Sequence, residues 1–259
     1  MHWMYDVPMG EQLDDDGDSL ESIEGCLTDA QYNRDEHRKA VIDDILDNWV
    51  SQSHNGKFHA ILATSSIPEA IKYYKLFAQR DCGLKTTAVF DPSDGNNESS
   101  IEKIDGIAQM LEDYNSLFGT CFNISGYASF KRDVCARLAH KTPYTAVENE
   151  PSKCLDILIV VDQMLTGYDS KWLNTLYMDK FYKWSNIEMI IQAFSRTNRV
   201  FNDDKPHGII RYYRRPYTMK NIIEYAFEQY SGQKPYGIFV AKLIQNLENM
   251  NAAFSDIND

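Results

Sequence analysis

The chain has 259 residues, of which 43 % are hydrophobic and 25 % charged, a globular composition that excludes wholesale disorder, collagen and coiled coils. No stretch approaches roughly 18 consecutive apolar residues, and the first residues are acidic, so we predict neither a membrane span nor a signal peptide. Five scattered cysteines without a CxxC pair favour free thiols and a cytoplasmic location over a disulfide or zinc framework.

The net charge is −12, from 26 basic and 38 acidic residues, and a negative total disfavours a polyanionic partner such as DNA. The acidic residues are unevenly distributed, however. Residues 1–50 contain 14 acidic and 3 basic side chains, whereas residues 168–220 contain 5 acidic and 10 basic ones. The acidity therefore belongs to one end of the chain, and the later region remains compatible with a nucleic-acid partner.

The chain opens with an acidic lead-in, which we place at residues 1–32. Its segment 10–25 (GEQLDDDGDSLESIEG) has few apolar residues, so we expect a flexible lead-in or part of a neighbouring element, and no contribution to the core. The next segment, 35–50, spaces apolar residues such as Val41 and Ile45 at helical intervals and predicts an amphipathic helix.

From residue 58 onward, short apolar runs alternate with amphipathic segments. The predicted strands are 58–64, 85–90, 155–162, 173–179 and 207–213, and the predicted helices are about 67–80, 99–116, 126–140 and 186–199. This alternation predicts an α/β fold with a parallel sheet covered by helices on both faces. We place this domain at 33–216 and expect a helical extension over 217–259.

The sequence contains no GxxxxGK[ST], GxGxxG, HExxH or GxSxG motif, so the chain has no triphosphate-binding loop of its own. The first stretch that carries chemistry is NIEMIIQAFSRTNRV. On a helix, Gln192, Arg196 and Arg199 would lie within about 60° of one another. Guanidinium groups match phosphate oxygens, so this ridge suits an anionic ligand. The spacing is equally compatible with a solvated arginine face paired with Asp203 or Asp204.

A second stretch, LDILIVVDQMLTGYDS, predicts a strand followed by a loop with Thr166, Gly167 and Asp169. Ligands of parallel sheets gather beyond the carboxyl ends of the strands. There Thr166 can contact a phosphate, Gly167 allows close backbone approach, and Asp169 can orient a cation, a ribose or an arginine. The alternative is an ordinary turn at Gly167, with Asp169 capping the next segment.

A third stretch, ATSSIPE, again joins a strand end to a helix start. The hydroxyl groups of Thr64 and Ser65, with the exposed N–H groups of the helix, form a natural phosphate contact. Taken alone, simple helix capping explains this pattern better.

The order of these stretches resembles motifs IV, V and VI in the second RecA-like domain of superfamily 2 helicases and translocases. TGYDSKWLNTLY, QAFSRTNR and the later GIIRYYRRP resemble more specifically the motor (R) subunit of type I restriction endonucleases. The resemblance is specific over about 155–216 and looser over about 33–250. In that family, a nuclease domain precedes two RecA-like motor domains and a helical region. The resemblance implies that this chain is a fragment with motor domain 2 and the start of the helices.

The resemblance also implies roles for individual residues. Arg196 and Arg199 would be the arginine fingers that reach ATP bound on helicase domain 1. Gln192, Gly167 and Asp169 would belong to the ATP cleft and couple it to DNA. ATP and Mg²⁺ would be bound mainly by the absent domain, and we expect no metal site in this fragment. The full-length subunit would be part of an ATP-dependent type I site-specific deoxyribonuclease. The isolated fragment is expected to be inactive.

On the DNA side, the resemblance implies that Thr64, Ser65 and Thr166 contact phosphates of double-stranded DNA, independently of its sequence. Six basic side chains of 168–220 add positive charge, and most of them are expected to be solvated: Lys171, Lys180, Lys183, Arg211, Arg214 and Arg215. Trp172 and Trp184 are candidate stacking platforms, although packed aromatic residues are commoner.

The resemblance implies two partners on the same polypeptide, helicase domain 1 and the nuclease domain, and two further subunits, the methyltransferase and specificity subunits. It also implies a bacterial or archaeal cytoplasm as the location and no membrane partner. Two alternatives stay open at this point. One is a non-catalytic nucleotide-fold adaptor module, and the other is part of a different superfamily 2 repair or remodelling motor. Genes for a methyltransferase and a specificity subunit beside the parent gene would favour the restriction enzyme.

Overall fold

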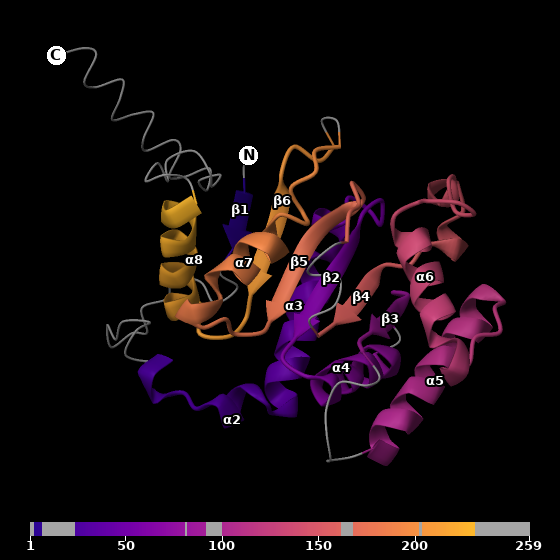
Figure 1. Cartoon of the computed structure of the whole chain (residues 1–259), viewed down its shortest axis with the longest axis horizontal. Coiled ribbons are helices and arrows are strands. Elements are labelled where there is room, and N and C mark those ends of the chain that lie inside the picture. The colour runs from indigo at the N-terminus through magenta and orange to yellow at the C-terminus, as the bar shows by residue number, and fades with distance from the viewer. Residues whose placement is uncertain are drawn as a thin grey trace, which may run out of the picture.

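The structure, a computed structural model, describes residues 3–6, 24–80, 82–91, 100–161, 168–201 and 204–230. These residues form a six-stranded sheet with helices around it, and every pair of neighbouring strands is parallel (Figure 1). The strands are β1 (Trp3–Asp6), β2 (His59–Thr64), β3 (Thr86–Val89), β4 (Ile157–Val160), β5 (Leu173–Asp179) and β6 (Gly208–Tyr212). Their order across the sheet is β1-β6-β5-β2-β4-β3. The predicted α/β fold with a RecA-like parallel sheet is confirmed.

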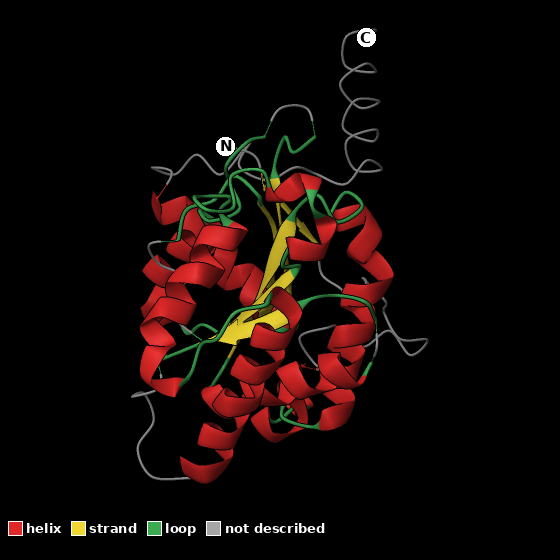
Figure 2. Ribbon diagram, turned by 90° about the vertical axis from the view of Figure 1, so that its right-hand side faces the viewer, coloured by secondary structure: helices red, strands yellow, loops and turns green. Residues whose placement is uncertain are grey.

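Helices lie on both sides of the sheet (Figure 2). They are α2 (Asp29–Tyr32), α3 (Asp35–Gln52), α4 (Ile67–Gln79), α5 (Ser100–Phe118), α6 (Tyr127–Leu138), α7 (Ile187–Phe194) and α8 (Pro216–Tyr230). Because helices cover both faces, the central strands β2, β4 and β5 are buried along their whole lengths. Strands that are buried on both faces are typically near-continuous apolar runs in the sequence. Among the described helices, none combines the length and the hydropathy needed to cross a bilayer.

The parallel arrangement gives the sheet two distinct edges. We call the edge where strands end, at Thr64, Val160 and Asp179, the carboxyl edge, and the edge where they begin, at His59 and Gly208, the amino edge. Every connection between strands must return from the carboxyl edge to the amino edge. Residues close in sequence can therefore lie at opposite edges.

Two described parts of the expected acidic lead-in pack against the domain, whereas residues 7–23, which include most of the segment 10–25, lie outside the described residues. Residues Trp3–Asp6 form β1, which pairs with β6. Glu24 is buried, and its carboxylate accepts hydrogen bonds from the backbone N–H groups of Tyr217 (3.1 Å) and Thr218 (2.9 Å). Because these carboxylate oxygens cap the exposed N–H groups at the start of α8, the lead-in and α8 hold each other in place.

The C-terminal part of the chain is described only as far as α8. This helix packs against α7, where the Phe227 ring lies 6.3 Å from that of Phe194 between centroids, so its packing is continuous with the domain. Residues 231–259, most of the predicted helical extension, lie outside the described residues. The boundaries at 33 and 216 stay a prediction.

Candidate functional site

Arg196 and Arg199 lie in a turn that follows α7, which we call the arginine turn (195–199). The predicted helix over 186–199 is too long, because α7 ends at Phe194. The Arg196 N–H bonds the carbonyl of Ala193 (3.1 Å), three residues back, and the following N–H groups keep this tighter spacing. The side-chain hydroxyl of Thr197 also donates to the Phe194 carbonyl (3.2 Å). The two arginines therefore do not share the helical ridge that their spacing predicted.

The arginine turn lies against the segment that carries Asp169. Arg196 donates from Nη1 to the carbonyl of Tyr168 (3.0 Å) and from Nε to that of Gln192 (3.1 Å). The Nε group of Arg199 forms an ion pair with the Asp169 carboxylate. Both side chains of this pair are about half exposed, at 59 % for Arg199 and 46 % for Asp169. An ion pair this accessible adds little to stability, so both groups can be redirected to a ligand at small cost.

Only one of the two predicted alternative partners of the arginines lies among the described residues. Asp204 forms an ion pair with Lys57 (2.5 Å), while Asp203 lies outside the described residues. Gln192 is exposed on the last turn of α7. The structure thus brings Gln192, Arg196 and Asp169 together on one side of the domain.

Asp169 lies at the amino edge of the sheet, and its predicted position beyond the carboxyl ends of the strands is wrong. The hydroxyl of its neighbour Tyr168 bonds His59 Nε2 at the start of β2 (3.0 Å). The reason is topological, since the connection from β4 must cross to the amino edge before β5 begins at Leu173. Thr166 and Gly167 lie outside the described residues.

The floor beneath this amino-edge site is aromatic. The Trp172 ring stacks on His140, with 3.9 Å between centroids, and packs against Phe201 at 4.6 Å. Trp172 is buried, which confirms the commoner expectation of packing. Trp184 is different, because it is 51 % exposed and meets Tyr225 edge-on.

A buried lysine that the sequence reasoning missed lies in the same region. Lys205 is 1 % exposed, and its ammonium group donates to the carbonyl of Lys171 (3.2 Å). Burial and, to a smaller extent, the nearby charge of Arg199 together lower the pKa of Lys205 from 10.5 to about 7. No carboxylate pairs with Lys205 among the described residues. Phe201 and Lys205 form an isolated antiparallel bridge, and nothing in the local sequence predicts that Lys205 is buried.

The Lys205→Met variant should be more stable than the wild type by about 2 kcal/mol at pH 6. Below pH 7 the native chain buries a charged ammonium, and this penalty is relieved as the pH rises from 7 towards 10.5, because only the unfolded chain then binds the proton. The gain should therefore shrink between pH 7 and pH 10. Urea unfolding across this range measures it, with the exposed Lys141→Met as the control. A gain that stays constant with pH would contradict a buried cation.

At the carboxyl edge, the structure separates Thr64 from Ser65. Thr64 is fully buried, and its hydroxyl donates to the carbonyl of Val160 (3.1 Å), so it joins β2 to β4 and is not presented to a ligand. Ser65 is exposed and lines a hollow of about 260 Å³ together with Arg214 and Arg215. Directly after it, the Ser66 side chain caps α4.

Beneath that hollow lies a buried network centred on Asp179, the last residue of β5. Its carboxylate accepts two hydrogen bonds from Arg214 (2.9 and 3.0 Å), one from Tyr73 (2.9 Å), and bonds His37 (2.7 Å). Burial raises the pKa of Asp179, but the bonds to His37 and Arg214 outweigh it, so the pKa lies below its ordinary value. Arg214 is 6 % exposed and Arg211 4 %, so these two are exceptions to the expectation that most basic side chains of this region are solvated.

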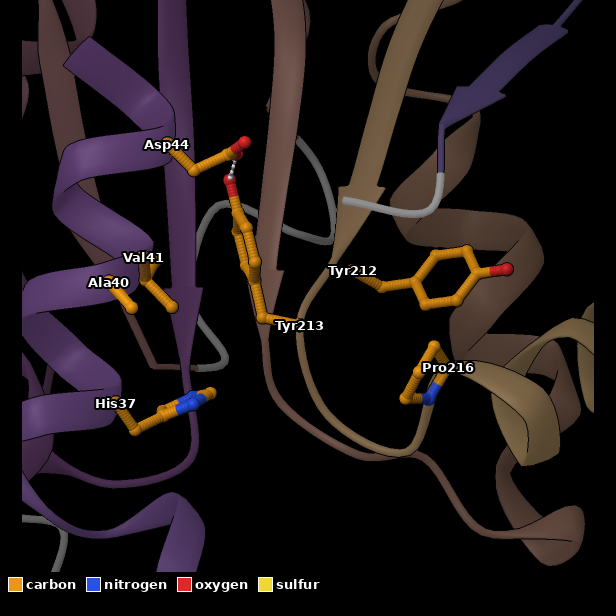
Figure 3. A pocket seen from close by; sticks show the side chains of 7 residues that line it. All are labelled: His37, Ala40, Val41, Asp44, Tyr212, Tyr213 and Pro216. Atoms are coloured by element: carbon orange, nitrogen blue, oxygen red, sulfur yellow. Dashed lines mark hydrogen bonds between the residues drawn. The ribbon is translucent and has the colours of Figure 1, made fainter. Parts of the chain in front are cut away.

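A small pocket of about 180 Å³ lies between α3 and the end of β6 (Figure 3). Asp44 projects into it and accepts a hydrogen bond from the Tyr213 hydroxyl (2.8 Å), as the dashed line in Figure 3 marks. Asp44 also accepts from Arg211 (2.7 Å), and His37 at the other end is bound to Asp179. These side chains hold α3 on the sheet, so we assign the pocket a packing role.

Comparison with known proteins identifies the family of the chain. The family model described as type I restriction enzyme subunit R domain 3 matches residues 56–215. A type I restriction enzyme endonuclease subunit of Staphylococcus saprophyticus is 32 % identical over 213 residues, which are 79 % of this chain and 22 % of that protein. One from Staphylococcus aureus is 31 % identical over 200 residues, which are 74 % of this chain and 20 % of that protein.

A putative type I restriction enzyme endonuclease subunit of Methanocaldococcus jannaschii is 44 % identical over 61 residues, which are 24 % of this chain and 6 % of that protein. The chain thus spans about a fifth of the length of the staphylococcal relatives. The family model covers more than half of the chain and contains both the arginine turn and Asp169. The chain therefore belongs to the family of type I restriction enzyme subunit R, domain 3.

Proposed function

We propose that the chain is motor domain 2 of an ATP-dependent DNA-translocating restriction subunit. In the order of domains that the resemblance implies, a nuclease domain comes first and two motor domains follow, so a third domain is the second motor domain. The observation that carries the proposal is the position of Arg196, Arg199 and Asp169, which meet as accessible groups at the amino edge of the sheet. Membership of the family argues against the adaptor module and against a repair or remodelling motor.

The amino edge suits the phosphates of a nucleotide bound on another domain. Arg196 and Arg199 carry permanent positive charges that attract phosphate oxygens. In the proposed mechanism, the two arginines reach the ATP on helicase domain 1 when the cleft closes and stabilise charge that develops during phosphoryl transfer. ATP and Mg²⁺ are bound mainly by that domain. The isolated chain lacks the phosphate loop, so by this proposal it does not hydrolyse ATP.

The carboxyl edge suits the backbone of double-stranded DNA. Ser65 presents a hydroxyl at the start of α4, where free N–H groups favour phosphates, and the half-buried Arg215 lines the same hollow. Such contacts are independent of base sequence, as a translocating motor requires. Thr166 stays a predicted DNA contact, and Thr64 would act indirectly, by fixing the strand end that positions Ser65.

The strand β2 joins the two proposed functional edges. At its start, His59 bonds Tyr168 beside Asp169, and at its end Thr64 bonds Val160 and leads into Ser65. All six residues of β2 are buried, so the strand is a rigid element. We propose that closure of the ATP cleft at Asp169 moves the DNA contacts at the opposite edge through this strand. The methyltransferase and specificity subunits would supply recognition of the DNA site.

The Ser65→Asp variant of the full-length subunit tests the DNA side of this proposal. A carboxylate placed beside a DNA phosphate should raise the Kd for duplex DNA by about tenfold, equivalent to about 1.4 kcal/mol. At saturating DNA, ATP turnover should stay close to that of the wild type, since the amino edge is untouched. Fluorescence anisotropy with labelled duplex measures the Kd, and the exposed Ser152→Asp is the control. Unchanged binding would exclude Ser65 from the DNA track.

A further inference from the structure

The arginine turn rests directly on the first residue of β6. A Cβ atom on Gly208 would lie 2.3 Å from Oγ1, 2.4 Å from Cβ and 2.6 Å from the backbone oxygen of Thr197. Real Cβ atoms do not approach other atoms this closely, so only glycine permits this contact. One of the three atoms belongs to the backbone, and a substitution could not be relieved by rotating a side chain.

Thr197 itself is held rigidly at the centre of the turn. It is fully buried, and its hydroxyl donates to the carbonyl of Phe194 at the end of α7 (3.2 Å). It directly follows Arg196 and precedes Arg199 by two residues. A displacement of Thr197 must therefore displace both guanidinium groups.

The elements on either side of the contact are also fixed. β6 pairs with β5, whose residues are all buried, from Ile209 to Tyr212 and with β1 at Gly208, and α7 packs against α8. The contact between Gly208 and Thr197 thus sets how far the end of α7 stands from the sheet. Nothing else in the described part of the arginine turn enters the fold as deeply, because Ser195 and Arg199 are exposed.

We infer that Gly208 and Thr197 are positioning residues, which set the reach of Arg196 and Arg199 toward the phosphates of ATP. This inference rests on the proposed arginine-finger role. Restoring ordinary van der Waals contact after adding a Cβ at Gly208 requires a shift of about 1 Å. Misplacement by that distance costs about 10²-fold where catalysis depends on exact geometry.

The Gly208→Ala variant of the full-length subunit tests the inference. We expect kcat for DNA-stimulated ATP hydrolysis to fall by about 10- to 100-fold while KM for ATP changes little, because the fingers act in the transition state. The matched control is Gly106→Ala. A Cβ there would also be crowded, at 2.9 Å from Ile71 Cγ2, but by a flexible side chain on α4, away from the arginine turn. The control should keep its kcat.

Variants of Thr197 keep the inference falsifiable if Gly208→Ala does not fold. Thr197→Ser retains the hydroxyl donor and should keep kcat, whereas Thr197→Val loses the bond to Phe194 and should lower it by about tenfold. Circular dichroism and duplex binding establish that each variant is folded. A folded Gly208→Ala or Thr197→Val variant with normal kcat would overturn the inference. Arg199→Ala in the same assay separates the two hypotheses, since normal turnover in that variant would instead refute the finger role.

Discussion

Arg199→Ala in the full-length subunit is expected to lower DNA-stimulated ATP turnover by about 10³-fold or more. The physical reason is the loss of a permanent positive charge at the phosphoryl group where negative charge develops during the reaction. The fold should survive the change, because the only ion pair described for Arg199 joins it to Asp169 and both side chains are about half exposed. The expected loss in unfolding free energy is below about 1 kcal/mol.

Steady-state ATP hydrolysis at saturating duplex DNA measures this effect, with thermal unfolding to establish folding. Arg80→Ala is the matched control, since Arg80 at the end of α4 forms a comparably exposed ion pair with Asp43 (2.6 Å). Arg199→Lys should recover only part of the activity, because an ammonium group cannot reproduce the bidentate geometry of a guanidinium. Near-normal turnover by a folded Arg199→Ala variant would refute the finger role.

Most of the fold follows from local sequence because its strands are buried on both faces. The segment 173–179 was predicted as a strand and is β5 with the same bounds, since a run of this kind has no exposed face to interrupt it. By contrast, β1 was not predicted. Its partner residues on β6 lie about two hundred positions further along the chain, and a four-residue strand at the margin of a sheet carries little local signal.

The candidate site was predicted in its residues but not in its geometry. Arg196 and Arg199 were placed on a helix because their spacing is helical, yet the helix ends before them when Thr197 packs onto Gly208. Asp169 was assigned to the carboxyl edge, because residues that directly follow a strand lie there. Asp169 instead lies near the end of the connection from β4 to β5, which has already returned to the amino edge. The errors in the length of the helix and in the position of Asp169 have one cause. Both features depend on contacts between distant parts of the chain, which the spacing of residues in the sequence does not reveal.

The Asp179 network was missed for a related reason. Its partners His37, Tyr73 and Arg214 come from three separate parts of the chain, so each one resembles an ordinary surface residue when read alone. The available signal was an aspartate that ends an otherwise buried strand at the carboxyl edge. A carboxylate at that position must find partners, because an isolated buried charge is too costly to retain.

Asp179→Asn is expected to lower the free energy of unfolding at pH 7 by about 3 to 5 kcal/mol, the usual cost of breaking a buried ion pair by removing one partner. The variant leaves the Arg214 guanidinium buried without its carboxylate, and it weakens the bonds to His37 and Tyr73. Urea unfolding of the chain measures the loss. Asp35→Asn is the control, because Asp35 also pairs with an arginine, Arg38, but its own side chain is 64 % exposed. This substitution should lower the free energy of unfolding by less than about 1 kcal/mol.

The pH dependence of that difference identifies the ionised carboxylate as its source. The pKa of Asp179 in the folded chain lies below its ordinary value of 3.8, so the folded state binds a proton less readily than the unfolded state. Its stabilisation is therefore fully present above pH 3.8 and is lost as the pH falls through the folded pKa. The gap between wild type and Asp179→Asn should stay constant from pH 7 to about pH 5 and narrow below pH 4. If the gap persists unchanged at the lowest pH where both chains fold, packing of the side chain stabilises the domain and its charge does not.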